Sequence, residues 1–286
     1  MGRKVIIASD STCDLSKELI EQYDVKILPL HINFGDESYS DGVDIHLSEL
    51  YEMVEQTKEL PKTSAVSPRE MHRFFRQFVE EGYDVFYTGI GSNLSVTYNV
   101  ARLEAEEFDG PVFVSDSGNL STGIGLLVLK ACTFRDQGLT ASEIKEKIDD
   151  LVPKVKSQFV VETLNYLHKG GRCSGTSLVL SKILSIKPMI VVRNGKMTVG
   201  KKFIGSMKKA VSGMVKMFLE DSKNYDNEFV FITHTLAHEK ATMIKEMIKD
   251  VEIKNLYDTV AGCVIGSHCG PGTIGILYIM NEKVVA

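Results

Sequence analysis

The sequence predicts an α/β protein of two domains, and three observations lead to this prediction. The chain has 286 residues, 43% of them hydrophobic, so it can bury a core without disulfides or metal ions. Short β-rich runs alternate with segments of helical length, which is typical of βαβ units and a mostly parallel sheet. The composition changes near residues 151–157, from Ser- and Thr-rich loops to a Lys- and Met-rich half. We expect one α/β domain over residues 1–155, with helices on both faces of its sheet, and a second over residues 156–286.

Individual elements can be placed in chain order. A serine cap, a proline and a capping-box glutamate (Ser67, Pro68, Glu70) predict a helix over residues 68–81. Thr140 and Glu143 form a second capping box, and Asn194-Gly195 between two β-like runs predicts a hairpin. The strands we expect are Lys4–Ala8, Val25–Phe34, Asp84–Thr88, Pro111–Ser115, Gln158–Glu162, Ile186–Val192, Glu228–Thr233 and Ile274–Met280.

Charge and cysteine usage exclude several classes of protein. With 33 Lys+Arg against 38 Asp+Glu, the formal net charge of −5 disfavours a general nucleic-acid binder, which needs a basic surface. The five cysteines are scattered without a CxxC pair, so neither a disulfide framework nor a thiolate zinc site is indicated. No apolar run is long enough for a signal peptide core or a membrane span. We expect a cytoplasmic protein without metal or cofactor, whose contact with membranes is at most transient.

Three strand ends in the first half are rich in hydroxyl groups. They are residues 9–12 (SDST), 91–95 (GSNLS) and 115–118 (SDSG). Strand ends at the carboxyl edge of an open α/β sheet are where ligands bind, and free N–H groups at helix starts attract anions. Ser, Thr and Asp are also good helix caps, so each loop alone has a structural explanation. Three such loops on one edge favour an anion site.

Two further segments place polar side chains on irregular backbone, residues 61–68 (PKTSAVSP) and 266–272 (GSHCGPG). We expect His268 on a tight turn before a strand, with either a functional role or a turn-stabilising hydrogen bond. Residues 169–172 (KGGR) either approach an anion, presenting Arg172, or end a helix. His234 and His238 are four apart, but the first lies in an expected strand, so a shared helix face and a metal pair are disfavoured.

Several catalytic signatures are absent from the sequence. It has no GxxxxGK[ST] loop, no complete dinucleotide fingerprint, no GxSxG elbow and no HExxH. The sequence therefore does not indicate an enzyme that works alone.

Six motifs in order, SDSTCDL, KTSAVSP, GSNLSVTY, VSDSGNLSTGIG, LHKGGR and SHCGPGTIG, resemble those of the DegV family of bacterial lipid-binding proteins. The resemblance runs from about residue 6 to residue 276. It implies two α/β domains with a long-chain fatty acid in a tunnel between them. It also implies the role of binding subunit for a fatty acid kinase, in which a separate ATP-binding partner converts the presented carboxylate to acyl-phosphate for phospholipid synthesis.

The resemblance also implies roles for individual residues. The family's usual second serine before the SxLS turn is Gly91 here, and its usual Gly-Thr after the turn is Val96-Thr97, so which serine contacts the carboxylate stays open. The residues implied as carboxylate-binding are Thr63, Ser64, Ser92, Ser95 and His268, and those implied as facing the partner or the phosphate are Arg172, Lys201 and Lys202.

Two other hypotheses stay open. One is a stand-alone hydrolase or transferase that acts on a small acyl or phosphoryl substrate through Ser92 or Ser95 with His268. The other is a domain that binds another protein and in which the hydroxyl groups only cap helices.

Overall fold

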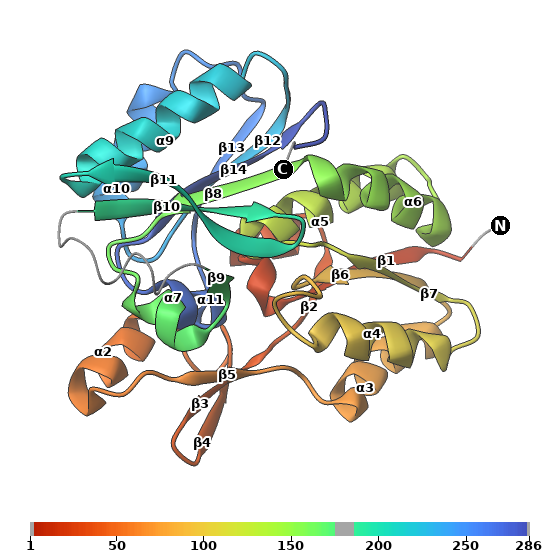
Figure 1. Cartoon of the computed structure of the whole chain (residues 1–286). Coiled ribbons are helices and arrows are strands. Elements are labelled where there is room, and N and C mark those ends of the chain that lie inside the picture. Colours follow the sequence, from red (N-terminus) through yellow and green to blue (C-terminus); the bar gives the residue numbers. More distant parts are fainter. Residues whose placement is uncertain (1–2, 175–185, 285–286) are drawn as a thin grey trace.

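The computed structural model describes residues 3–174 and 186–284 and has the α/β architecture that the sequence predicts. A four-stranded sheet and a seven-stranded sheet lie above one another with helices between and around them, and a three-stranded sheet projects from the side of the molecule (Figure 1).

The four-stranded sheet is parallel throughout, in the order β2-β1-β6-β7. Helices α3 and α4 pack against one face, and α5 and α6 pack against the other (Figure 1). The two predicted capping boxes are present at the starts of α3 and α6. The strands are β1 (Val5–Asp10), β2 (Val25–Leu28), β6 (Asp84–Gly89) and β7 (Val112–Asp116), and the helices are α1 (Lys17–Gln22), α3 (Pro68–Glu80), α4 (Thr97–Glu106), α5 (Thr122–Asp136) and α6 (Ala141–Leu151).

The prediction of one strand over Val25–Phe34 is wrong. β2 ends at Leu28, and β3 (His31–Phe34) belongs to the three-stranded sheet with β4 (Glu37–Ser40) and β5 (Lys62–Ser64). Pro29 lies at the break and has no N–H for a ladder. The backbone N–H of Leu30 instead donates to Ser11 Oγ at 3.1 Å, and the chain turns into the next sheet.

The seven-stranded sheet has the order β13-β12-β14-β8-β10-β11-β9 and mixes parallel and antiparallel pairs. The predicted hairpin at Asn194-Gly195 joins β10 to β11, and both residues have positive φ, 49° and 74°. The strands are β8 (Val155–Val160), β9 (Cys173–Ser174), β10 (Ile186–Arg193), β11 (Lys196–Ile204), β12 (Tyr225–His234), β13 (Asn255–Val260) and β14 (Ile274–Met280); α9 (Met207–Asp221) and α10 (His238–Met247) cover the outer face.

Helix α5 is the shared core of the two larger sheets. Every residue from Thr122 to Cys132 is buried, because one side of the helix packs on β1 and β6 and the other on β8, β12 and β14. Gly125 permits this close approach, since a Cβ there would lie 2.9 Å from the Cys13 carbonyl oxygen. The start of α5 is therefore held between the two halves of the chain.

Three helices near the small sheet complete the fold. α2 (Leu47–Thr57), α7 (Asn165–Gly170) and α11 (Cys263–Cys269) pack on one another although they come from distant parts of the sequence (Figure 1). The expected boundary near residue 155 coincides with the start of β8, yet α11 from the second half packs against α2, β3 and β5 of the first. The division into domains over 1–155 and 156–286 stays a prediction.

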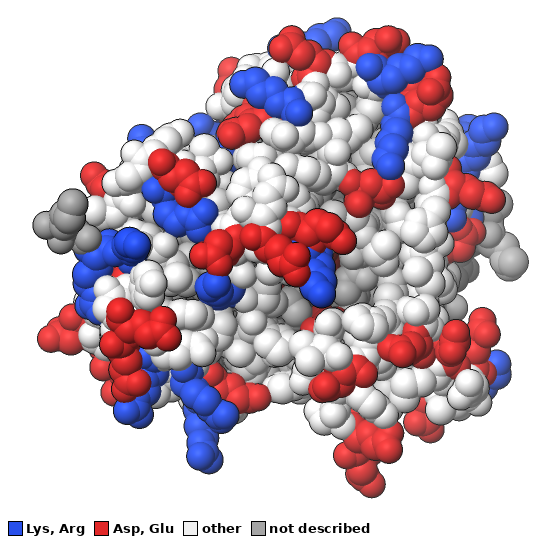
Figure 2. All heavy atoms as spheres, turned by 180° about the vertical axis from the view of Figure 1, so that it is seen from behind, with Lys and Arg blue, Asp and Glu red and all other residues white. Residues whose placement is uncertain are grey.

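The surface carries both signs of charge. Figure 2 shows acidic side chains interspersed with basic ones on the face opposite to that of Figure 1. Among the described residues, no helix has the length and apolar character needed to cross a membrane.

Candidate functional site

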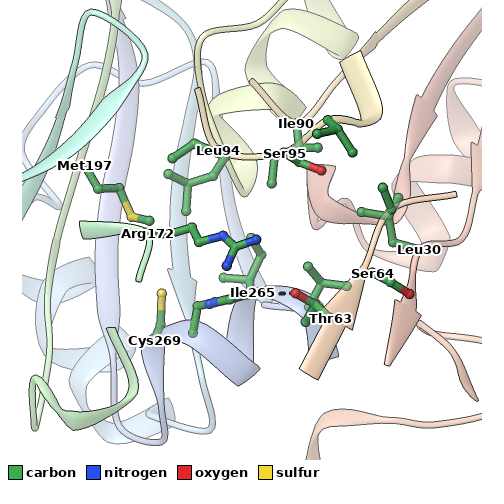
Figure 3. Close-up of a pocket in the computed structure, with 15 residues that line it drawn as sticks. Leu30, Thr63, Ser64, Ile90, Leu94, Ser95, Arg172, Met197, Ile265 and Cys269 are labelled. Carbon is green, nitrogen blue, oxygen red and sulfur yellow. Dashed lines mark hydrogen bonds between the residues drawn. The ribbon is translucent and has the colours of Figure 1, made fainter. Parts of the chain in front are cut away.

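A cavity of about 120 Å³ lies where α11, the small sheet and the start of α4 meet (Figure 3). We call it the head cavity. Polar and apolar side chains line it together, and they come from both halves of the sequence: Leu30, Thr63, Ser64, Ala65, Ile90, Leu94, Ser95, Val96, Leu120, Arg172, Met197, Val264, Ile265, His268 and Cys269.

Thr63 and His268 meet in this cavity although they are 205 residues apart in the chain. Thr63 Oγ1 lies 2.8 Å from His268 Nε2, the bond drawn as a dashed line in Figure 3. Burial, helped by the positive charge of Arg172, lowers the pKa of His268 to about 4, so the imidazole is neutral at pH 7. When Nε2 carries the proton and donates it to Thr63, the Thr63 hydroxyl hydrogen is free to donate to an anion in the cavity.

His268 lies in the last turn of α11, so the prediction that it lies on a tight turn is wrong. The turn follows immediately, at Gly270 and Gly272, whose φ angles are 77° and 76°. α11 is only seven residues long and begins at a glycine cap without a side-chain bond. Such a short helix needs tertiary contacts to be stable, and a sequence pattern does not reveal them.

Two buried carboxylates supply those contacts at the start of α11. Asp41 Oδ1 accepts from the backbone N–H of Cys263 at 2.7 Å, and Asp14 Oδ1 accepts from that of Gly262 at 2.8 Å. Negative charge is favourable at a helix N-terminus, although burial raises the pKa of both carboxyls. Asp41 belongs to none of the motifs described above, whereas Asp14 is part of SDSTCDL, and both accept hydrogen bonds at the start of α11.

Gly170 makes room for the His268 ring. A Cβ at Gly170 would lie 2.3 Å from His268 Nδ1, a distance that no packed side chain tolerates. Nδ1 is buried and has no hydrogen-bond partner among the described residues. The LHKGGR motif therefore contributes a close approach at Gly170 as well as Arg172, and the helix-stop interpretation also holds, since α7 ends at Gly170.

The three predicted serines lie in different environments. Ser95 lines the head cavity, and its Oγ accepts from the Thr97 N–H at 3.2 Å and lies 2.9 Å from Thr97 Oγ1. Ser64 also lines the cavity but is exposed and accepts from Asn33 Nδ2 at 3.1 Å. Ser92 is not part of the lining, and its backbone N–H donates to Asp116 Oδ1 at 3.0 Å. Of the three serines, Ser64 and Ser95 thus line the head cavity, and Ser92 does not.

The predicted basic residues separate into two groups. Arg172 extends into the middle of the head cavity (Figure 3), where its Nη1 donates to the Gly170 carbonyl oxygen at 2.9 Å. Lys201 and Lys202 are exposed on β11, outside the lining of the head cavity. Lys201 lines a separate cavity between β11 and α9, with its Nζ 5.7 Å from the Phe203 ring centre.

A second, smaller cavity of about 30 Å³ adjoins the head cavity and lies between the seven-stranded sheet, α11 and the start of α5. We call it the deep cavity. Three residues, Leu120, Ile265 and Cys269, line both cavities. The rest of the deep lining is Ser121, Ser157, Phe159, Thr233, His234, Thr235, Ala261, Thr273, Gly275 and Leu277.

The hydroxyl groups around the deep cavity are already hydrogen-bonded within the protein. Thr235 Oγ1 donates to the Gly270 carbonyl oxygen at 2.6 Å, and Thr273 Oγ1 donates to that of Cys269 at 2.9 Å. The other partners are Asp14 for Ser121, Asn119 for Ser157, and Thr122 and Thr259 for Thr233. Because each group has a partner, the deep cavity favours an apolar occupant in spite of its composition.

His234 lines the deep cavity but is fully engaged. Its Nδ1 accepts from the Ala237 N–H at 3.2 Å and its Nε2 lies 3.2 Å from Asp258 Oδ1. It ends β12 whereas His238 begins α10, so the two histidines do not share a helix face, as predicted. Within residues 3–174 and 186–284, no group of three or more His, Cys, Asp or Glu side chains is placed to hold a metal ion.

In the described part of the chain, neither Ser92 nor Ser95 is hydrogen-bonded to His268. The hydroxyl on His268 is that of Thr63, whereas the Ser95 hydroxyl is bonded to Thr97. His268 is a weak base because of its lowered pKa, and in the described residues no acid orients its Nδ1. The arrangement is suited to holding an anion.

Comparison with known proteins identifies the family of the chain. The family model described as "Uncharacterised protein, DegV family" matches residues 4–281. A DegV domain-containing protein of Clostridium perfringens is 35% identical over 277 residues, which cover 96% of this chain and 98% of that protein. The chain belongs to the DegV family.

Solved structures of DegV proteins share the fold over nearly the whole chain. A fatty-acid-binding DegV family protein from Thermus thermophilus has a TM-score of 0.90 at 27% identity, covering 97% of this chain and 99% of that one. A stearic-acid-binding protein from Eubacterium ventriosum has a TM-score of 0.85 at 31% identity, covering 98% of each chain. The α/β fold class predicted from the sequence is confirmed.

Proposed function

We propose that this DegV-family protein binds a long-chain fatty acid, with the carboxylate in the head cavity and the tail directed through the residues shared by both cavities into the deep cavity. One observation carries the proposal. A cavity with convergent polar groups, Thr63, Ser95, Arg172 and His268, adjoins a cavity whose hydroxyls are all satisfied. An amphipathic ligand with one anionic end matches that contrast.

The head cavity can stabilise a carboxylate without closing around it. An ionised carboxylate removed from water costs several kcal/mol unless it is hydrogen-bonded. The Thr63 and Ser95 hydroxyls supply donors, and the remaining N–H groups of Arg172 supply charge. Neutral His268 holds Thr63 in place and adds no second charge to the cavity.

Burial of the tail supplies the affinity. Each CH₂ that leaves water contributes about 0.8 kcal/mol, so a long acyl chain offers on the order of 10 kcal/mol before the costs of association and ordering. Micromolar to nanomolar affinity is the expected range. The apolar linings of both cavities and the absence of free hydroxyls in the deep one favour such a tail.

We propose further that the bound carboxylate is presented in the cytoplasm to a separate ATP-dependent fatty acid kinase, for phospholipid synthesis. A carboxylate oxygen forms a bond to the γ-phosphorus of ATP, the bond from that phosphorus to the β,γ-bridging oxygen breaks, and ADP leaves. Hydroxyl donors leave the carboxylate more nucleophilic than a bidentate arginine would. Arg172 can interact with the negative charge of the acyl-phosphate after the transfer. Lys201 and Lys202 are proposed to contact the partner.

The direct test of ligand binding is to denature the purified protein, extract it with organic solvent and identify the released molecule by mass spectrometry. We expect a C14–C18 acid in near-stoichiometric amount. An empty protein that also fails to bind added oleate or palmitate contradicts the proposal.

Matched variants test which residues hold the carboxylate. Thr63→Val and Ser95→Ala are expected to weaken palmitate binding about 10- to 100-fold, because hydrogen bonds to charged groups contribute about 1.5–3 kcal/mol. Ser92→Ala and Ser64→Ala are the controls and should bind within about twofold of the original chain. Equal losses in all four variants would contradict the assignment.

The kinase role is tested by reconstitution with an ATP-dependent fatty acid kinase subunit. Thr63→Val and His268→Ala should slow acyl-phosphate formation. Expressed as a free energy of activation, this loss should exceed the loss in the free energy of unfolding. Unchanged turnover in both variants, or turnover of acyl and phosphoryl esters without any partner, would overturn the role.

A further inference from the structure

Three side chains line both the head cavity and the deep cavity and so lie between them, and we call this group the neck: Leu120, Ile265 and Cys269. All three are buried, with exposed fractions of 4%, 7% and 3%. Ile265 and Cys269 are one turn apart on α11, and Leu120 lies in the segment before α5. A tail that passes from one cavity to the other has to pass between these side chains.

The backbone around the neck is hydrogen-bonded and packed on each side, which resists widening by backbone movement. The Cys269 carbonyl oxygen accepts from Thr273 Oγ1 at 2.9 Å, and the next residue, Gly270, packs so closely on Tyr166 that a Cβ would lie 2.6 Å from its ring. The N–H of Leu120 donates to Asn119 Oδ1 at 3.2 Å. The width of the neck is therefore set by side-chain size.

Beyond the neck there is little room. The deep cavity has about 30 Å³, compared with about 120 Å³ for the head cavity. Its walls are formed by hydrogen-bonded Thr235 and Thr273 and by buried Phe159, whose exposed fraction is 6%, and these groups cannot move without losing partners or packing. A methyl branch near the end of a tail would need space that these walls do not provide.

We propose that the neck makes this protein selective for fatty acids with unbranched chain ends, and that Cys269, the smallest of the three side chains, keeps the passage open. The inference rests on the proposed fatty-acid binding and adds the class of acid. The thiol acts through its size. Burial raises its pKa well above the usual range, so it stays an uncharged thiol in the passage.

The test compares three acids by competition for binding: hexadecanoate, its isomer 14-methylpentadecanoate, and octanoate, whose tail is the shortest. The unaltered chain should bind hexadecanoate at least tenfold more tightly than the branched isomer, a difference of the size that one methyl group causes in a tight pocket. Ile265→Ala widens the neck and should reduce that preference to less than threefold. Equal binding of the two isomers by the unaltered chain, or an unchanged preference in Ile265→Ala, would overturn the inference.

A second pair of variants separates the neck from the head cavity. Cys269→Phe closes the passage and should weaken hexadecanoate binding at least tenfold more than it weakens octanoate binding, because the tail of octanoate is the shorter. Cys269→Ala removes the thiol and widens the passage, so it should reduce the preference for hexadecanoate over the branched isomer, as Ile265→Ala does. Equal losses for both acids in Cys269→Phe would contradict the neck. If neither straight-chain acid binds even the unaltered chain, the proposed function itself fails.

Discussion

The head and deep cavities are built from similar residue types and differ in whether the hydroxyl hydrogens are already donated to acceptors within the protein. Threonine and serine line both. In the deep cavity the hydroxyl groups of Thr235 and Thr273 donate to backbone carbonyl oxygens. In the head cavity Thr63 is instead paired with a neutral imidazole that can donate to it. The polarity that a cavity offers to a ligand therefore depends on which hydrogen-bond donors have no acceptor within the protein, and not on the residue types alone.

The largest effect is expected from Asp41→Ala, which removes the acceptor at the start of α11. Two buried N–H groups, those of Cys263 and Val264, lose their partner, so the free energy of unfolding should fall by about 3–4 kcal/mol. Urea unfolding measures this change, and palmitate binding should weaken because His268 moves with α11. A loss below about 1 kcal/mol would mean that α11 does not depend on Asp41.

Acidification should destabilise the head cavity through His268. Its pKa is about 4 in the folded protein and 6.5 in an unfolded chain, so the unfolded state takes up a proton first as the pH falls. The contribution of neutral His268 to the free energy of unfolding is fully present above pH 6.5 and is lost as the pH falls towards 4. Between pH 7 and 4.5 it amounts to about 2–3 kcal/mol.

The contribution of His268 is isolated by the difference between the unaltered chain and His268→Gln. Buried Asp14 and Asp41, whose pKa values are raised, act in the opposite direction, so only this difference is informative. Identical dependence of unfolding on pH in both chains would contradict a buried neutral His268.

Gly170→Ala should damage only the head cavity. The new Cβ would overlap His268 Nδ1, which costs about 2 kcal/mol of stability and separates the ring from Thr63. In a His268→Ala background the same substitution should cost less than about 0.5 kcal/mol, because the ring is gone. Additive effects in this double-mutant cycle would show that the two residues do not touch.

The smallest effect is expected from Thr273→Val in the deep cavity. Removing the hydroxyl leaves the Cys269 carbonyl oxygen without that donor and should lower stability by about 1 kcal/mol. Palmitate affinity should stay within threefold, because this hydroxyl is not available to a ligand. A large gain or loss of affinity without a change in stability would show that the deep cavity presents a free polar group and would remove the contrast with the head cavity.

The local elements of the fold were predictable because their signals are local. The capping boxes at Ser67 and Thr140 and the hairpin at Asn194-Gly195 depend on residues within a few positions of one another, and the structure confirms them. The prediction of a single strand over Val25–Phe34 was wrong because the segment divides at Pro29. The part before Pro29 pairs in the four-stranded sheet, and the part after it pairs in the three-stranded sheet. The wall of the head cavity includes Thr63, Ser95, Arg172 and His268 among the predicted site residues, all taken from motifs.

By itself, the sequence determined the α/β class, the family and several of the residues that line the head cavity, because periodicity, caps and motifs depend on neighbouring positions. Only the tertiary structure decided which of these residues meet. It placed His268 on a helix held by Asp41, brought it to Thr63 from 205 residues away, and left Ser92 outside the head cavity. It also decided that the hydroxyl groups of the deep cavity form hydrogen bonds within the protein. Hydrogen-bond partners and packing distances depend on chain segments far apart in sequence, and no local pattern contains them.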